Sequence, residues 1–456
     1  MSNFILKTLE TRELKLNTIR LRGFYGGKLR KGSGGGGSSD GFPQLPGDVT
    51  RWHFGGLTNE MMAAMDDPRI EDADHKGRFL SFKNFAWKEG SGISDVYPGA
   101  LVFDGVDDYG VCENFPILTK EKGYTVVALR QWISMGEGIS GLVSNVKNWF
   151  NDGAFVLEYN SNNATNKFVN RPVSFGNVNI EMDLPNNFTY QTSKSYKGVP
   201  ITTGSFKGTN SLFVGKLNNI IGNCSNVAIW ELVILDHDAT KEELTKIKDY
   251  FVKTYPWLFP DQAWTVTGKT NEDEDRATIA NITGNGNDLV LSNFGFIEGS
   301  GYNEEGEYAG YLVTDGVDDK AVSKQFKFGE NFTVILDFKF PVKKISYCGF
   351  DLSAKVRIQN LQDSGVYVVL KGNKTLIPSN VVRAVTSEGK VYDENWNEYN
   401  IVPGNISSNY TMVNLGFDGS IQFAESVTKL AGIYSSTLSK DECIKAYSYL
   451  QTLKAK

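Results

Sequence analysis

The pentapeptide Asp-Gly-Val-Asp-Asp occurs twice in this chain, at residues 104–108 and again at residues 315–319. Its flanks recur as well: Asn84-Phe85 and the Glu-Gly-Ser-Gly of residues 89–92 return as Asn293-Phe294 and residues 298–301. The period of about 200 residues is far longer than a solenoid or propeller repeat, so each copy predicts a complete domain with its own core. We therefore place a first module at residues 52–259 and a second at residues 261–456.

Composition favours an all-β fold for both modules. Aromatic residues make up 12% of the 456 residues, 47 are glycine, and only 22% are charged. Many short strands joined by tight turns produce this balance, because aromatic rings fill a pleated surface and glycine adopts the positive φ of turns.

The net charge, the apolar runs and the cysteines indicate which kinds of binding partner and cross-link to expect. A net charge of −6 gives no argument for nucleic acid or a membrane surface. No apolar run approaches the ~20 residues that span a bilayer, so we expect no membrane partner. The N-terminus lacks the apolar core of a signal peptide, so we expect release inside a particle if the protein leaves a cell. The cysteines stand at non-equivalent places in the two repeats and predict small buried side chains: Cys112, Cys224, Cys348 and Cys443.

Residues 1–39 differ from the rest of the chain. Up to Lys31 they hold eight basic residues against two acidic ones, a net charge of +6 that leaves −12 for the remainder. Apolar and polar residues alternate between Leu14 and Leu21, which predicts a strand, and a Gly/Ser-rich linker follows. We interpret this segment as a docking and oligomerisation arm with these basic residues: Lys7, Arg12, Lys15, Arg20, Arg22, Lys28 and Arg30. A frayed terminus, an engineered linker and a nucleic-acid-binding arm are the alternatives.

Each module is predicted to consist of successive strands closed by one helix. Strands are expected at residues 100–103, 109–113, 125–133, 154–159, 211–215 and 227–235, and in the second module at residues 311–314, 332–340, 366–370 and 422–434. A capping box begins each helix, from Thr240 to Glu243 and from Ser439 to Glu442.

Residues 99–109, together with the final strand and a Thr-x-x-Glu-Leu-x-x-Ile helix, resemble the concanavalin A-like, laminin-G-type jelly roll. The second copy departs from the first, since Thr314 and Lys320 replace Phe103 and Tyr109, and only the second copy has the family's opening, at residues 282–289. The resemblance implies two tandem jelly-roll sandwiches, each closed by a short C-terminal helix, behind the N-terminal arm.

Such paired modules behind a short arm are similar to virion proteins of gut bacteriophages. This resemblance implies a head or tail fibre-like projection, located in the virion, that docks through its arm on capsid or tail proteins. It also implies a homo-oligomer, with a trimer as first candidate, whose modules adhere to the host surface or to mucin-type glycans. A stand-alone carbohydrate-binding, lectin-like adhesin is the alternative.

The acidic motif has two interpretations. As structure, Asp104-Gly105 forms the tight turn of a hairpin whose returning strand begins at Asp107-Asp108. As a site, clustered carboxylates offer the oxygen ligands that calcium prefers. The candidate ligands are Asp104, Asp107 and Asp108, with Asp315, Asp318 and Asp319 in the second copy. No other cofactor is expected.

We expect no enzymatic activity. Glycoside hydrolases on this fold set carboxylates at alternate positions of one strand, and the nearest match, from Glu181 through Asp183, ends in Pro185. The acidic run at residues 272–275 predicts a solvated loop, and the histidines show no Ser or Cys constellation: His53, His75 and His237.

Large aromatic rings near loops are the remaining candidates for sugar binding, since a sugar face stacks on a flat ring. Tyr302 and Tyr308 flank a Glu- and Gly-rich loop and, with Trp87, are the predicted ligand contacts. The other rings near predicted loops are Trp149, Tyr159, Trp257, Trp264 and Trp396.

Overall fold

The computed structural model describes residues 41–455 apart from residues 120, 135–139, 147–154, 161–167, 171–177, 180–186, 201–207, 219–223, 342–347, 354, 361–365, 406–409 and 417–422. The chain divides into two units, Met1–Gln44 and Leu45–Lys456, and the elements below belong to the second. The predicted docking arm lies outside the described residues.

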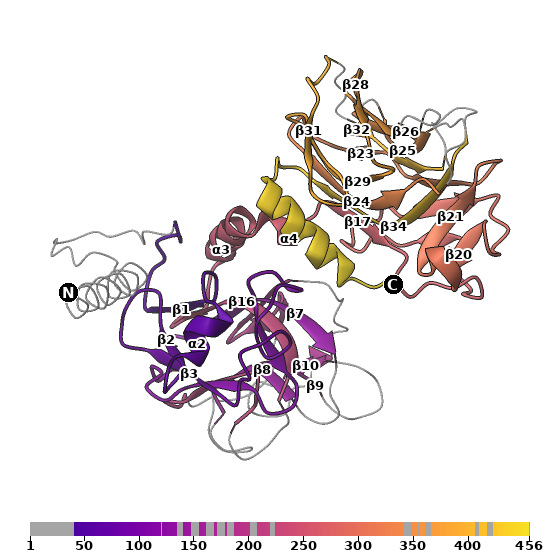
Figure 1. Cartoon of the computed structure of the whole chain (residues 1–456). Coiled ribbons are helices and arrows are strands. Elements are labelled where there is room, and N and C mark those ends of the chain that lie inside the picture. The colour runs from indigo at the N-terminus through magenta and orange to yellow at the C-terminus, as the bar shows by residue number, and fades with distance from the viewer. Residues whose placement is uncertain are drawn as a thin grey trace, which may run out of the picture. The chain divides into compact units, whose positions relative to one another are not determined.

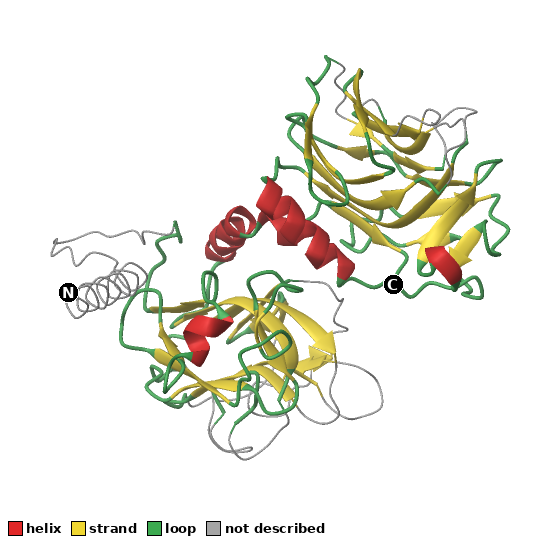
Figure 2. Ribbon diagram, in the orientation of Figure 1, coloured by secondary structure: helices red, strands yellow, loops and turns green. Residues whose placement is uncertain are grey.

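Two antiparallel sheets form the first sandwich (Figures 1 and 2). One sheet has the order β14 (Val199–Pro200), β13 (Ser195–Tyr196), β12 (Phe188–Thr192), β7 (Thr125–Ser134), β16 (Asn226–Leu235), β5 (Leu101–Asp104) and β4 (Gly92–Ile93), and β1 (Val49–His53) also pairs with β16. The other has the order β11 (Val178–Asn179), β10 (Phe168–Asn170), β9 (Val156–Asn160), β8 (Ser140–Ser144), β15 (Leu212–Val214), β6 (Tyr109–Cys112), β3 (Phe79–Lys83) and β2 (Arg69–Glu71). Its helices are α2 (Asn59–Ala63), α3 (Lys241–Thr254) and the 3-10 turn η1 (Pro256–Leu258).

The second sandwich repeats this plan without sharing a described strand with the first. Its first sheet has the order β20 (Gly301–Asn303), β21 (Tyr311–Asp315), β34 (Glu425–Tyr434), β24 (Thr333–Lys339), β29 (Val381–Thr386), β30 (Lys390–Tyr392) and β31 (Glu398–Asn400), with β17 (Gln262–Thr265) on β34. Its second sheet has the order β18 (Thr278–Ile279), β19 (Leu289–Ser292), β22 (Lys320–Ser323), β33 (Val413–Leu415), β25 (Cys348–Leu352), β26 (Val356–Asn360), β27 (Val366–Leu370) and β28 (Asn373–Ile377). A small sheet pairs β23 (Phe326–Lys327) with β32 (Tyr410–Thr411), and the helices are η2 (Gly306–Tyr308) and α4 (Lys440–Gln451).

The fold prediction is confirmed: the chain is all-β, with two tandem sandwiches. The central order β12-β7-β16-β5 of the first module returns as β29-β24-β34-β21 in the second. Each module fills its interior with a separate hydrophobic cluster. On β24, Val334, Leu336 and Phe338 belong to that core, so the alternation of a strand directs Asp337 and Lys339 to the other side of the sheet.

Local signals in the sequence located the closing helices correctly. Both capping boxes form: the Thr240 side chain accepts from the Glu243 backbone and Glu243 bonds back, and Ser439 and Glu442 do the same. The four cysteines are buried, as predicted. Among the described helices none is long and apolar enough to cross a bilayer.

Candidate functional site

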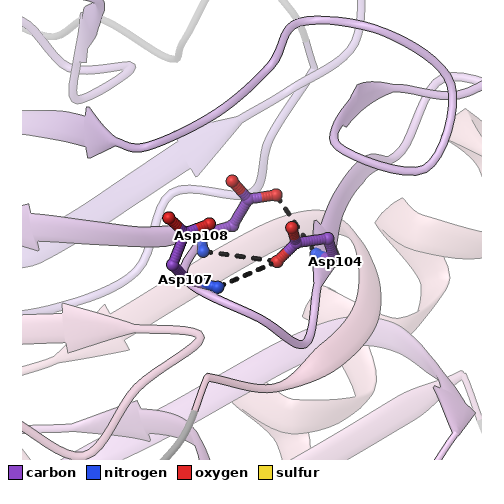
Figure 3. Close-up of side chains that lie close together, drawn as sticks. All are labelled: Asp104, Asp107 and Asp108. Carbon is purple, nitrogen blue, oxygen red and sulfur yellow. Dashed lines mark hydrogen bonds between the residues drawn. The ribbon is translucent and has the colours of Figure 1, made fainter.

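The acidic motif forms a backbone-capping turn (Figure 3). One oxygen of Asp104 accepts the backbone N–H groups of Val106, Asp107 and Asp108 at 2.8, 3.2 and 3.3 Å. In return, the Asp108 carboxylate accepts the backbone N–H of Asp104 at 3.1 Å. Gly105 has φ +79°, which a residue with a Cβ rarely adopts. The side chains of Asp104 and Asp108 therefore satisfy the amides of a turn that has no strand partner.

This turn is not the hairpin that the sequence predicts. β5 before the turn pairs with β16 in one sheet, whereas β6 after it pairs with β15 and β3 in the other. In the second module β21 and β22 are separated in the same way. The motif therefore carries the chain from one layer of each sandwich to the other, which a reading of turn residues alone cannot distinguish from a hairpin.

The second copy reproduces the geometry. Asp315 accepts the N–H groups of Val317, Asp318 and Asp319 at 2.8, 3.3 and 3.4 Å, and Asp319 accepts from the Asp315 backbone at 2.9 Å. The repeated Asn-Phe segment packs here as well. The side-chain amides of Asn84 and Asn293 donate to the carbonyls of Asp107 and Asp318, each at 3.0 Å. The duplicated sequence segments thus meet at one structural feature.

The carboxylates of each turn lie close enough to share a cation. In both copies the three aspartates have ligand oxygens within 4.8 Å of one another. Burial, with smaller contributions from neighbouring carboxylates, raises the pKa of Asp108 and of Asp319 to about 6. A hard cation such as calcium fits these oxygens in kind, but Asp104 and Asp315 already hold backbone amides. Calcium at the turns stays a prediction.

Two of the three rings predicted to contact a ligand are positioned for packing. Tyr302 is only 2% exposed and its hydroxyl donates to the Arg276 carbonyl at 2.8 Å, so the prediction that it contacts ligand is wrong. β20 directs this ring into the core, which a loop-adjacent position in the sequence does not reveal. Trp87 is half-buried and stacks on Phe85 with ring centroids 5.0 Å apart. One of its faces is thus occupied by the protein.

Tyr308 belongs to a different environment, on the side of the second module's first sheet that is turned away from the core. Lys339 on β24 places its ammonium 4.6 Å from the Tyr308 ring centroid and 5.4 Å from that of Tyr311 on β21. The Arg383 guanidinium on β29 lies 4.7 Å from the centroid of Tyr447 on α4, and Trp396 meets Tyr447 edge to face at 5.8 Å. We call this set of contacting side chains the aromatic face: Tyr308, Tyr311, Asp337, Lys339, Arg383, Trp396, Lys429 and Tyr447.

Asp337 is the polar centre of the aromatic face. Its carboxylate accepts the Arg383 guanidinium, the Tyr447 hydroxyl at 3.2 Å and the Gln451 amide at 2.8 Å, with the Tyr311 hydroxyl at 3.3 Å. Burial, reinforced by Asp337, raises the pKa of Tyr311 to about 12, so its hydroxyl keeps its proton at neutral pH. The four rings are half-buried, and each leaves part of its surface to solvent.

Sequence reasoning found only Tyr308 and Trp396 of this face. Tyr311 and Lys339 stand within predicted strands, Arg383 stands outside them, and Tyr447 stands on the predicted closing helix. Strand alternation gives the signal for Lys339 and Asp337, since both interrupt the apolar positions of β24. Which strands and helix bring these side chains together depends on sheet order, which no local pattern encodes.

The groups considered for catalysis lie in an exposed turn or beside carboxylates where they are described. Residues 272–275 form an exposed or half-exposed turn, as predicted. His53, His75 and His237 contact the carboxylates of Glu231, Glu71 and Glu243 at 3.1, 3.0 and 3.2 Å. The Glu181, Asp183 and Pro185 stretch, like the basic residues of the arm, lies outside the described residues.

Comparisons with known proteins give no family. No family model matches the chain, and no curated protein does. Among solved structures, the similar ones include Trypanosoma rangeli sialidase in complex with 2,3-difluoro-KDN (10% identity, TM-score 0.30), with 42% of this chain aligned to 32% of that one. The receptor-binding domain of botulinum neurotoxin D (9% identity, TM-score 0.33) aligns over 80% of this chain and 96% of its own, and the binding domain of Paraclostridial Mosquitocidal Protein 1 (14% identity, TM-score 0.25) over 41% and 51%. This chain thus spans about a third of the sialidase, and similarity at these levels carries no functional argument.

Proposed function

We propose that this protein is a carbohydrate-binding adhesin of a bacteriophage virion, a head or tail fibre-like projection that presents its jelly rolls to glycans of the host surface or of its surroundings. The aromatic face of the second module is the observation that carries the binding part of this proposal. Tyr308, Tyr311, Tyr447 and Trp396 offer flat apolar surfaces, and Lys339 and Arg383 offer hydrogen-bond donors beside them. A sugar ring presents the same mixture of apolar C–H face and polar hydroxyl edge.

The binding role rests on groups that recognise a ligand rather than on groups that would transform one. Asp337, the one carboxylate at the centre of the face, is held by Arg383, Tyr447, Gln451 and Tyr311. A carboxylate whose oxygens are occupied by several donors is poorly placed to attack a substrate or to accept a proton from it. We therefore propose adhesion without catalysis.

Binding of the full chain to an array of glycans tests the proposal. We expect Tyr308→Ala and Tyr311→Ala to abolish the signal, because each removes a stacking surface. Tyr367→Ala is the matched control: Tyr367 on β27 also lies under a lysine, Lys374 at 5.2 Å, but in the second module's other sheet. An unaltered signal in the Tyr308 and Tyr311 variants, or none for the wild type, would contradict the proposal.

The virion part of the proposal concerns the basic arm. If residues 1–39 dock the protein on capsid or tail proteins, their deletion should leave both modules folded and prevent incorporation into particles. Light scattering of the full and arm-deleted chains tests the proposed homotrimer, which should fall to a monomer on deletion. Incorporation at the normal level would instead favour the second candidate function, a stand-alone lectin.

A further inference from the structure

The charge of the aromatic face is the starting point. Lys339 and Lys429 place their ammonium groups 5.4 and 6.0 Å from the centroid of the same ring, that of Tyr311. Lys339 also lies 4.6 Å from the Tyr308 ring. Two cations on the neighbouring strands β24 and β34 therefore lie beside two half-buried tyrosines, Tyr311 on β21 and Tyr308 on η2.

A β-bulge presents Lys429. Along β24 and β34, Asp337 pairs with Leu430 and Phe338 with Thr428, so Lys429 is an extra residue without a partner in the ladder. Bulges re-aim a side chain and recur beside binding sites. The first module has a bulge at the matching place, but there Trp230 is the extra residue, fully buried, with its indole N–H bonded to the Pro98 carbonyl at 2.9 Å. The cation is specific to the second module.

Three acidic groups lie around these tyrosines and lysines: Asp337, Glu307 and Glu425. The Asp337 side chain is 6% exposed and is occupied by Arg383. Glu307 reaches Lys339 only at 4.0 Å, with its side chain 76% exposed, a geometry in which solvent screens the pair strongly. Burial, Glu307 and then Glu425 raise the pKa of Tyr308, so Glu425, at the start of β34, lies near that ring. No ion pair of Lys429 occurs among the residues that the structure describes.

We propose that Lys339 and Lys429 bind the anionic group, a carboxylate or a sulfate, of an acidic sugar whose ring lies against Tyr311 and Tyr308. This inference rests on the proposed function and adds the class of sugar. Two ammonium groups beside aromatic rings match a ligand with an anion on a flat apolar body, because charge-assisted bonds fix the anion and the rings cover the C–H face. In the first module Trp230 stands in place of Lys429, so this pair of lysines is not repeated there.

Matched probes separate the charge from the sugar. The full chain is titrated with oligogalacturonate and its methyl ester, and with a sulfated galactan oligosaccharide and its desulfated form. Polyglutamate serves as a polyanion without a sugar ring. We expect an acidic sugar to bind at least about tenfold more tightly than its uncharged counterpart, the difference that one charge-assisted contact provides, and polyglutamate to bind no better than the uncharged sugars.

Two variants locate the site. Lys339→Gln and Lys429→Gln should each lose the preference for the acidic sugar, and the double variant should bind both forms of a probe alike. Lys374→Gln, which removes the lysine beside Tyr367, is the control and should keep the preference. Circular dichroism and the unfolding midpoint verify that each variant is folded.

The outcomes distinguish this inference from the proposed function. Equal binding of the charged and uncharged sugars, or an unchanged preference in the double variant, overturns the acidic-sugar site while sugar binding stands. Binding of polyglutamate as tight as that of the acidic sugars overturns the role of the sugar ring. No binding of any glycan, on the array or in solution, overturns both.

Discussion

Each module has a buried carboxylate in its first sheet, at an equivalent pair of facing residues. The two modules carry this carboxylate on opposite strands of that pair. In the first module Leu129 on β7 faces Glu231 on β16, whereas in the second Asp337 on β24 faces Leu430 on β34. In the first module Arg51, only 1% exposed, Tyr250 and Tyr255 enclose Glu231. In the second the paired Arg383 side chain is 18% exposed and lies among half-buried rings.

The difference shows how a duplicated fold can enclose an ion pair in one copy and leave its counterpart near the surface in the other. In the first module the arginine that pairs with the acid comes from β1, as Arg51. In the second module the acid stands on the facing strand, and its arginine partner, Arg383, comes from β29 instead. Ala263 on β17 occupies the place equivalent to Arg51, as its pairing with Gly432 indicates. The first module thus seals its ion pair under α3, and the second leaves cations and rings accessible at its surface.

The largest loss of stability is expected when the buried ion pair of Glu231 and Arg51 is broken. Glu231→Gln removes the negative charge opposite the buried Arg51 and should lower the free energy of unfolding of the first module by about 3–5 kcal/mol. Urea unfolding of the full chain measures this loss. The double variant Glu231→Leu with Arg51→Met serves as the control, because replacing both charges by apolar groups should restore most of the stability. A mild effect of Glu231→Gln would mean that water reaches this pair.

Removing the charge of Asp337, which pairs with the partly exposed Arg383, should lower the free energy of unfolding less than Glu231→Gln does. Asp337→Asn retains an acceptor for Tyr447 and Gln451, and solvent reaches Arg383, so we expect a loss of about 1–3 kcal/mol in the free energy of unfolding. The same urea experiment compares it directly with Glu231→Gln. Equal losses in the two modules would remove the distinction between a sealed and an open face.

The acidic turns are where the modules agree, and both should respond to pH in the same direction. The pKa of Asp108 and of Asp319 is raised to about 6, above the unfolded value, so folding favours their protonated forms. The stabilisation is complete below pH 4 and is lost as pH rises through about 6, by an amount on the order of 1–3 kcal/mol per turn. Thermal unfolding between pH 4 and 7 should show this decline, and the double variant Asp108→Asn with Asp319→Asn should lack it.

Calcium sharpens the interpretation of these turns. If they are structural, as their backbone bonds indicate, calcium or its chelation should leave the unfolding midpoint at pH 7 unchanged. A midpoint that rises with calcium in the wild type and not in the Asp108→Asn, Asp319→Asn variant would establish the metal site instead, because a bound cation favours the ionised carboxylates.

The smallest expected effects separate two tyrosines of the second module. Tyr302→Phe removes a part-buried hydrogen bond to the Arg276 carbonyl and should cost about 0.5–1.5 kcal/mol in the free energy of unfolding, with sugar binding unchanged. Tyr308→Phe, at the surface, should change that free energy by less than about 0.5 kcal/mol. A larger loss at Tyr308 than at Tyr302 would contradict their assignment to surface and core.

Prediction from the sequence succeeded where the cause is local. The strands that became β7 and β16 follow from long runs of β-branched and aromatic residues, and both closing helices follow from their capping boxes. It failed for Tyr302, because a position near a loop does not reveal which way a short strand turns its ring. It also failed for the connection between β5 and β6, because Asp-Gly favours a tight turn whether the next strand returns to the same sheet or enters the other.

The sequence by itself determined the duplication, the all-β class, the closing helices and the burial of the four cysteines. Hydrophobic periodicity and helix caps depend on residues that are close in the sequence, so these signals do not depend on the tertiary arrangement. Only the tertiary structure decided that β21, β24, β29 and α4 bring Tyr311, Lys339, Arg383 and Tyr447 around Asp337. These residues are as much as 136 positions apart, from Tyr311 to Tyr447, and their meeting depends on sheet order and on a bulge, which arise from packing across the whole module.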